Sequence, residues 1–170
     1  DFDGDGRMDL LVGVPSESVG AVGNAGLVHV IYGSGGWSNN DGFYQNTAGW
    51  PDASESGDRF GSALTTGDFN NDGFDDIVIG SPYEDLGSSN QLVDAGIITV
   101  AYGSASGLTN PVNLHQYSPG VGTNSETGDL FGAALASGDI NGDGYDDVVV
   151  GVPGEGISKR DRAGAVHVIY

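Results

Sequence analysis

The chain of 170 residues contains no cysteine, and only five of its residues are lysine or arginine. Without cysteine it can form no disulfide framework and no thiolate metal site. Binding to nucleic acid needs clustered basic side chains that contact phosphates, and five basic residues against 24 acidic ones argue against that class of partner. No apolar run approaches the roughly 18 residues of a membrane-spanning helix, so no membrane span is expected.

Helical patterning is also missing from the sequence. No segment combines apolar residues at helical spacing with capping residues at its ends. Glycine is abundant instead, with 31 residues, and much of it falls at turns between short β-branched runs. The composition therefore predicts an all-β fold.

An acidic motif of nine residues occurs three times. Residues 68–76 and 139–147 follow the pattern Asp-x-Asn-x-Asp-Gly-x-Asp-Asp, and residues 1–9 follow a close relative of it. Side-chain oxygens at positions 1, 3, 5 and 9 can converge on one hard cation, with a backbone carbonyl supplied by position 7. Glycine at position 6 suits a tight loop that needs positive φ. The predicted ligands are Asp1, Asp3, Asp5, Arg7 and Asp9 in the first motif, Asp68, Asn70, Asp72, Phe74 and Asp76 in the second, and Asp139, Asn141, Asp143, Tyr145 and Asp147 in the third.

The chemistry of these ligands favours calcium. Calcium takes six to eight oxygen ligands, whereas magnesium, the main competitor, requires octahedral geometry and keeps its waters. Zinc and copper are disfavoured because the motifs contain neither cysteine nor histidine. An EF-hand would need glutamate at position 12, where this chain has Val12, Ile79 and Val150. Clusters of Asp, Asn and Gly can also be plain turns, but three copies in one context favour about three bound calcium ions.

The motif belongs to a longer repeat. Each copy runs into a β-branched segment, and a second β-branched segment follows that ends in tyrosine. A Phe-Gly-x-Ala-Leu segment before the motif and a fainter strand near 42–45 and 112–117 complete a unit of four strands. Repeated four-stranded units are typical of β-propeller blades. The landmarks of the repeat are Phe-Gly at 60–61 and 131–132, Gly-x-Pro at 13–15, 80–82 and 151–153, and the closing tyrosines Tyr32, Tyr102 and Tyr170.

Phe-Gly, the acidic motif and Gly-x-Pro, in this order, resemble the FG-GAP repeat of integrin α-subunit propellers, and the resemblance covers essentially the whole chain. It implies a propeller, usually of seven blades, with calcium in the loops between the first two strands of a blade. It also implies that partners bind mainly on the opposite face. The loops expected on that face are 16–25, 83–95, 154–163, 46–56 and 118–127.

The strand tally gives about two and a half blades. Residues 1–56 are expected to form a blade without its first strand, residues 57–127 a complete blade, and residues 128–170 a blade without its last strand. Ten strands with open edges do not close a propeller, which uses 4–8 blades. We therefore expect a larger propeller, whose remaining blades come from the same or another chain.

The sequence favours a binding module over an enzyme. It contains no Gly-x-Ser-x-Gly nucleophile motif. His29 and His167 share one repeat position with Thr99, which indicates a structural slot better than a catalytic base. The formal charge of −19 is partly metal chemistry, since ten carboxylates occupy ligand positions and three calcium ions would leave −13.

The resulting hypothesis is a calcium-stabilised module, extracellular or on the cell surface, that binds protein or carbohydrate. Extracellular calcium modules bind at about 10⁻⁴–10⁻³ M, so such sites fill outside the cell rather than in the cytosol. The alternative is an accessory domain of a secreted hydrolase, because the repeats are similar to those appended to phospholipase-type enzymes. Candidate ligand contacts, for which packing between blades is an equally good interpretation, are Trp37, Phe43, Tyr44, Trp50 and Tyr83.

Overall fold

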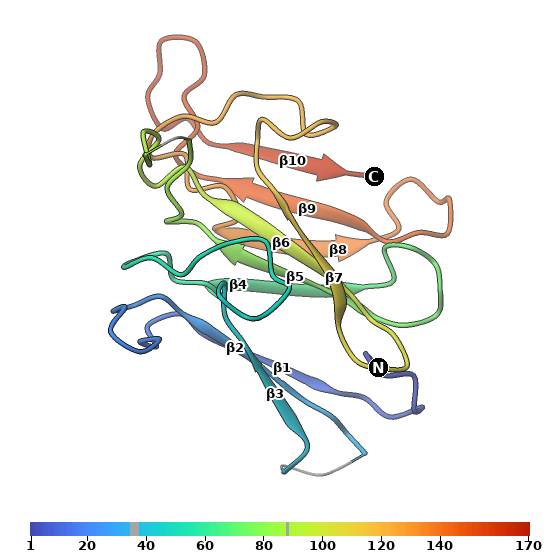
Figure 1. Cartoon of the computed structure of the whole chain (residues 1–170). Helices are drawn as coiled ribbons and strands as arrows, with labels where there is room; N and C mark the ends of the chain where they lie inside the picture. The colour runs from blue at the N-terminus through green and yellow to red at the C-terminus, as the bar shows by residue number, and fades with distance from the viewer. Residues whose placement is uncertain (35–37, 88) are drawn as a thin grey trace.

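The computed structural model describes residues 1–34, 38–87 and 89–170, and the named elements in these ranges are all β-strands. They form three antiparallel sheets in which strands adjacent in sequence are hydrogen-bonded neighbours (Figure 1). This arrangement confirms the predicted all-β class with blade-like sheets. The first sheet contains β1 (Leu10–Val14), β2 (Leu27–Ile31) and β3 (Asn40–Phe43), the second β4 (Ala63–Gly67), β5 (Asp76–Ser81), β6 (Ile97–Tyr102) and β7 (Thr109–Leu114), and the third β8 (Ala134–Gly138), β9 (Asp147–Val152) and β10 (Ala165–Ile169).

The sheets stack face to face, and the alternation of side chains along β5 shows how the middle sheet serves two cores. Ile77 and Ile79 belong to the apolar cluster shared with the first sheet. Val78 belongs to the cluster shared with the third sheet. Successive strand side chains point to opposite faces, so one β-branched run buries residues on both sides. All six residues of β5 are accordingly buried.

β4 and β8, which are edge strands of the second and third sheets, also contact each other directly. The Thr65 and Ser137 hydroxyls lie 2.7 Å apart, and the Ser137 hydroxyl donates to the Thr66 carbonyl at 2.6 Å. These bonds join β4 to β8. The sheets are therefore tied by polar contacts as well as by apolar packing.

The Phe-Gly pairs precede the strands that they were expected to begin. Phe60 and Phe131 are fully buried, yet β4 starts at Ala63 and β8 at Ala134. The Phe60 N–H donates to the Ala25 carbonyl at 2.9 Å, across to the first sheet's β1–β2 connection. The Phe131 N–H makes the equivalent bond to Ala95 at 3.0 Å. Each Phe-Gly turn therefore fastens its sheet to the preceding one.

The fourth strand of each unit ends earlier than predicted. β3 ends at Phe43 and β7 at Leu114, so the expected strand ranges 42–45 and 112–117 extended too far. The residues that leave the strands include Gln45 and Gln116, both buried. Their amide groups donate hydrogen bonds to carboxylates of the next sheet. The alternation of residues along a strand does not predict such a contact.

These glutamines contact one glutamate position. Gln45 Nε2 donates to Glu84 Oε2 at 2.6 Å, and Gln116 Nε2 donates to Glu155 Oε2 at 2.5 Å. Glu84 is 4% exposed, and burial, with the nearby charges of Asp52 and Asp58, raises its pKa to about 9. Gln45 Oε1 is buried without a hydrogen-bond partner, and a protonated Glu84 carboxyl could donate to it.

Glu84 should make the chain less stable as the pH rises. Its pKa is higher in the folded state than in the unfolded one, so its contribution is fully present below the unfolded value near 4.5 and is lost as pH climbs toward 9. Urea unfolding at constant saturating calcium should therefore find Glu84→Gln more stable than wild type at pH 8, by on the order of 2 kcal/mol.

At pH 4 the Glu84→Gln variant and the wild type should be nearly equal in stability. Glu155→Gln is the matched control, because Glu155 occupies the same repeat position but is only half-buried. If the stabilities of Glu84→Gln and wild type changed with pH by the same amount, the raised pKa of Glu84 would be contradicted.

Candidate metal centre

The three acidic motifs lie along one edge of the stacked sheets. Residues 1–9 run into β1, residues 68–76 join β4 to β5, and residues 139–147 join β8 to β9. In Figure 1 the N-terminus, the green loop and the orange loop are together at the right, whereas the β1–β2, β5–β6 and β9–β10 connections are at the left. The motifs therefore lie at a common edge, and the second and third are hairpin connectors.

Within a motif, the side chains at odd positions fold over the loop's own backbone. The Asp68 carboxylate accepts the N–H groups of Asp72 at 3.0 Å and Gly73 at 2.9 Å. Asp72 Oδ1 then accepts the Phe74 N–H at 3.0 Å. Equivalent bonds hold Asp139 and Asp143 in the third motif. The glycines at position 6 have φ values of 85, 89 and 93°, which confirms the positive φ expected there.

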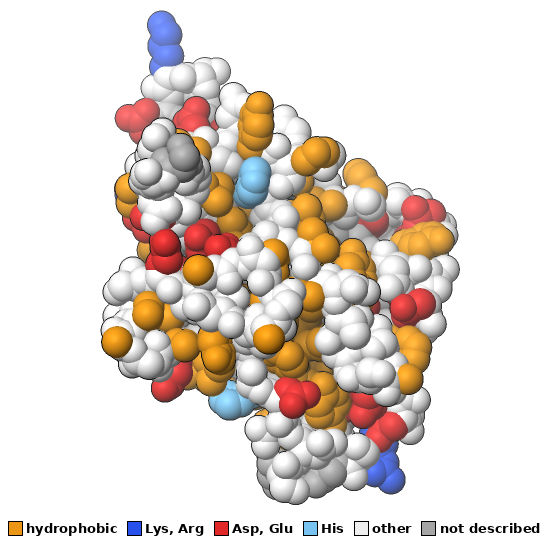
Figure 2. Space-filling model, viewed as in Figure 1, with side chains coloured by type: hydrophobic (Ala, Val, Ile, Leu, Met, Phe, Trp, Pro, Cys, Tyr) orange, Lys and Arg blue, Asp and Glu red, His pale blue; other side chains and the backbone are white. Residues whose placement is uncertain are grey.

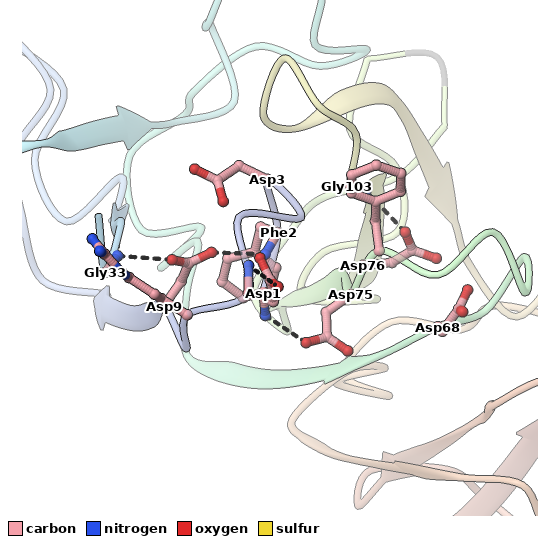
Figure 3. Close-up of polar contacts among 12 residues, drawn as sticks. Asp1, Phe2, Asp3, Asp9, Gly33, Asp68, Asp75, Asp76 and Gly103 are labelled. Carbon is pink, nitrogen blue, oxygen red and sulfur yellow. Dashed lines mark hydrogen bonds and ion pairs between the residues drawn. The ribbon is translucent and has the colours of Figure 1, made fainter. Parts of the chain in front are cut away.

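The first motif brings three carboxylates together. Asp1, Asp3 and Asp9 each place one oxygen within 4.8 Å of the other two, the one such group found among the described residues (Figure 3). Asp1 Oδ1 is buried without a hydrogen-bond partner. Like-charged oxygens at this spacing repel, and an oxygen-only donor set with an unpaired buried oxygen fits a hard cation such as calcium.

The second and third motifs are arranged differently, because their third position is an asparagine. Asn70 Nδ2 donates to Asp72 Oδ2 at 3.0 Å, and Asn141 Nδ2 donates to Asp143 Oδ2 at 3.0 Å. In each of these motifs the asparagine amide at position 3 therefore donates to a carboxylate oxygen of the aspartate at position 5. The first motif has aspartate at position 3 and lacks this bond. Ligation by these two motifs, and by the carbonyls of Arg7, Phe74 and Tyr145, stays a prediction.

The position 9 aspartates have a role that the sequence did not reveal. Asp9 accepts the Phe2 N–H at 2.7 Å and the Gly33 N–H at 2.8 Å. Asp76 accepts the Phe69 N–H at 3.0 Å and the Gly103 N–H at 2.8 Å, and burial raises its pKa to about 6. One carboxylate therefore ties the start of the loop to the turn after the neighbouring strand.

Asp147 is the position 9 aspartate of the third motif. Its Oδ2 accepts the Ile140 N–H at 2.8 Å, while its Oδ1 is buried without a partner. A carboxylate oxygen has two lone pairs, so these N–H bonds leave room for a cation at position 9.

The opposite edge carries a pocket of about 390 Å³. Tyr117 at its rim is 72% exposed, and two polar atoms, His115 Nδ1 and Ser125 Oγ, are buried without hydrogen-bond partners. Burial also lowers the pKa of His115. The lining residues are Leu86, Gly87, Leu92, His115, Tyr117, Asn124 and Ser125.

Two of the five aromatic residues considered from the sequence, Phe43 and Trp50, are placed in packing roles. The Phe43 and Trp50 rings stack at 5.3 Å, and Trp50 meets Phe60 edge-on at 5.7 Å. Both Phe43 and Trp50 pack against the core between the first two sheets. Tyr83 lies under the Arg59 guanidinium at 4.7 Å, and Trp37 lies outside the described residues.

His167 occupies a structural slot, as its repeat position indicated. Its Nδ1 lies 3.2 Å from the Val121 carbonyl and its Nε2 lies 3.2 Å from the Thr123 hydroxyl. Its ring also packs 5.9 Å from that of Phe131. These contacts give the imidazole a packing environment and hydrogen-bond partners within the fold.

On the face shown in Figure 2, acidic side chains are widely distributed and basic ones are not. Figure 2 shows Asp and Glu scattered across the viewed face, with Lys and Arg side chains only at two of its extremities. No helix in the described ranges is long and apolar enough to cross a membrane.

The comparison with known families follows the same repeat. The model of the FG-GAP repeat matches residues 1–31, 60–100 and 131–169. The chain belongs to the FG-GAP repeat family. Each matched segment of this FG-GAP chain includes the Gly-x-Pro landmark and the β-branched strand on either side of it.

Curated relatives match almost the whole FG-GAP chain. Integrin alpha-8 of Mus musculus is 34% identical over 95% of it, and Integrin alpha-PS5 of Drosophila melanogaster is 30% identical over 91%. Phosphatidylinositol-glycan-specific phospholipase D of Mus musculus is 34% identical over 90%. The chain spans only 14% of the two integrin subunits and 17% of the phospholipase.

Proposed function

We propose that the chain is a calcium-binding part of an FG-GAP propeller, extracellular or on the cell surface, that binds a protein or carbohydrate ligand and is stabilised by calcium. The observation that carries this proposal is the convergence of Asp1, Asp3 and Asp9 at an edge where two further acidic loops also lie. Calcium is the cation that such an oxygen-only set suits. Its role is structural, because each acidic loop connects two strands or leads into one.

In this proposal each sheet with its loops is one blade, with the divisions 1–56, 57–127 and 128–170. The remaining blades belong to the same or another chain. The relatives named as integrin alpha subunits favour an adhesion-like interaction, and the share of each relative that this chain covers leaves ample sequence for further blades. The extracellular location agrees with calcium sites of 10⁻⁴–10⁻³ M affinity.

The pocket at the edge opposite the acidic loops is the proposed ligand position. Small ligands bind in concave, mostly apolar sites with a few placed polar groups. Leu86 and Leu92 supply apolar wall, and the exposed Tyr117 ring supplies a flat face with a hydroxyl at its end. The unpaired His115 Nδ1 and Ser125 Oγ could bond to sugar hydroxyls or peptide groups.

Tyr117→Ala should weaken ligand binding by roughly tenfold or more, because large aromatic side chains that become buried against a ligand carry a large share of the binding energy. The chain would first be screened in calcium against arrays of glycans and extracellular-matrix proteins. The best ligand would then be titrated by calorimetry with the wild type and the variant.

Tyr145→Ala is the control for the Tyr117 experiment, since Tyr145 is 45% exposed but lies in the third acidic loop. It should leave the affinity for the ligand unchanged. Equal losses in the two variants, or none in Tyr117→Ala, would place the ligand elsewhere.

A second candidate is an accessory domain of a secreted hydrolase, which the similarity to phosphatidylinositol-glycan-specific phospholipase D favours. In both proposals this chain itself is not the catalyst. Hydrolysis of a glycosylphosphatidylinositol substrate by the whole protein that contains the chain, but not by the chain alone, would favour the accessory role. Cleavage by the chain itself would contradict both proposals.

A further inference from the structure

Position 8 of the second and third motifs carries an aspartate that contacts the preceding loop. Asp146 Oδ2 accepts the Asp68 N–H at 3.0 Å, and the Asp146 N–H donates to the Asp68 carbonyl at 3.1 Å. A similar pair of contacts occurs one sheet earlier, with an ion pair to the terminal ammonium in place of the first bond. Asp75 Oδ2 lies 2.6 Å from the Asp1 amino nitrogen, and the Asp75 N–H donates to the Asp1 carbonyl at 3.2 Å (Figure 3).

The packing around these bonds is close. A Cβ on Gly67, the residue before Asp68, would lie only 2.6 Å from Asp146 Oδ2. Glycine at this position lets the carboxylate reach the Asp68 N–H. In the first motif position 8 is Met8, whose side chain is 90% exposed and cannot accept an N–H.

Position 1 of the second loop is therefore fixed from two sides. The Asp68 backbone is held at both its N–H and its carbonyl by Asp146, which belongs to the next sheet. The Asp68 carboxylate is held by the N–H groups of Asp72 and Gly73 in its own loop. The direction in which Asp68 presents its carboxylate depends on both sets of bonds.

We propose that Asp75 and Asp146 are positioning residues for the cation site of the preceding loop, so that neighbouring FG-GAP cation sites are coupled through position 8. This inference rests on the proposed calcium binding. Partners that orient a metal ligand without touching the metal typically change the affinity 10–100-fold. This coupling is structural: the ligand geometry of the second loop depends on Asp146, which is not itself at a predicted ligand position of the third loop.

The test reads each loop separately in the full chain. A tryptophan at position 7 sensitises the luminescence of terbium bound in the same loop, so Phe74→Trp reports on the second loop and Tyr145→Trp on the third. With the Phe74→Trp reporter, Asp146→Ala should raise the terbium dissociation constant about tenfold. With the Tyr145→Trp reporter, Asp146→Ala should change the terbium dissociation constant of the third loop by less than about twofold. Asp146 is part of that loop but is not at one of its predicted ligand positions.

Asp146→Asn is the rescue variant, because its Oδ1 can still accept the Asp68 N–H. It should return the second-loop dissociation constant to within about threefold of wild type, since a neutral acceptor keeps roughly half the strength of a charged one. Asp161→Ala, at an exposed carboxylate in the β9–β10 connection, is the charge control and should change neither loop.

The outcomes separate the coupling from the calcium proposal. If the Phe74→Trp chain binds neither terbium nor calcium, calcium binding in this loop fails. If the cation binds but Asp146→Ala leaves the second loop unchanged, or weakens the third loop instead or both alike, the coupling is refuted. If circular dichroism shows that Asp146→Ala does not fold, Gly67→Ala, which pushes a methyl against the Asp146 carboxylate, should give the same selective loss at the second loop.

Discussion

Transfer from 10 mM calcium into a chelator should lower the melting temperature of the chain by more than about 10 °C. At a hundredfold excess over its dissociation constant, one bound ion stabilises the folded state by about 2.7 kcal/mol. Sites of about 10⁻⁴ M affinity reach that excess in 10 mM calcium. Three such sites would supply about 8 kcal/mol, and in a chain of this size each kcal/mol shifts the melting temperature by about 2–4 °C.

The physical reason for this loss is the crowding of like charges. Asp1, Asp3 and Asp9 hold oxygens within 4.8 Å of one another, and without a cation their repulsion opposes the closed loop. The loops also set the ends of strands, since Asp76 and Asp147 are at once motif residues and the first residues of β5 and β9. Loosening a loop therefore frees the edge of a sheet.

Differential scanning calorimetry with calcium, with magnesium and with chelator would measure this effect. Asp72→Ala should remove about a third of the calcium-dependent stabilisation and leave the third loop able to bind, because each loop supplies its own oxygens. Asp161→Ala, an exposed carboxylate outside the motifs, should melt like the wild type. A melting curve that chelator does not move would refute the structural role of calcium.

The sequence predicted the elements that are written in local residue patterns. β-branched runs marked β5, β6 and β9, and glycine at position 6 marked the positive φ of each loop. These features depend on residues within one unit, so strand and turn propensities are sufficient to find them. The repeat of these patterns also identified the family before any contact was known.

Contacts between units could not be predicted in the same way. Asp146 meets Asp68 and Glu84 meets Gln45 across 78 and 39 residues, and no local pattern states which sheet faces which. The sequence assigned no role to the position 8 aspartate, whose partner is in the preceding loop. The sequence does show that the motifs differ at this position, because the second and third carry Asp75 and Asp146 whereas the first carries Met8.

Gly80→Ala should destabilise the chain by about 3 kcal/mol, the upper part of the range for overpacking a buried site. A Cβ at Gly80 would overlap the carbonyl oxygen of Gly132 in the Phe-Gly turn of the next sheet. That oxygen is backbone, so no side-chain rotation relieves the overlap and the sheets must move apart. The same close approach recurs between Gly13 and the Gly61 carbonyl, which explains the glycine that opens the first two Gly-x-Pro landmarks.

Gly151→Ala is the matched control for Gly80→Ala, and comparing the two isolates the packing between sheets. Within their own sheets the two positions are alike, since a Cβ would lie 3.4 Å from Ala63 Cβ at Gly80 and 3.2 Å from Ala134 Cβ at Gly151. Neither glycine has positive φ, so alanine costs no backbone strain at either site. Urea unfolding of the 170-residue chain should then find Gly151→Ala within about 1 kcal/mol of wild type, because removing glycine from a strand is itself mildly stabilising. Equal losses in both variants would mean that Gly80 is required by its own strand rather than by the Phe-Gly turn that packs against it.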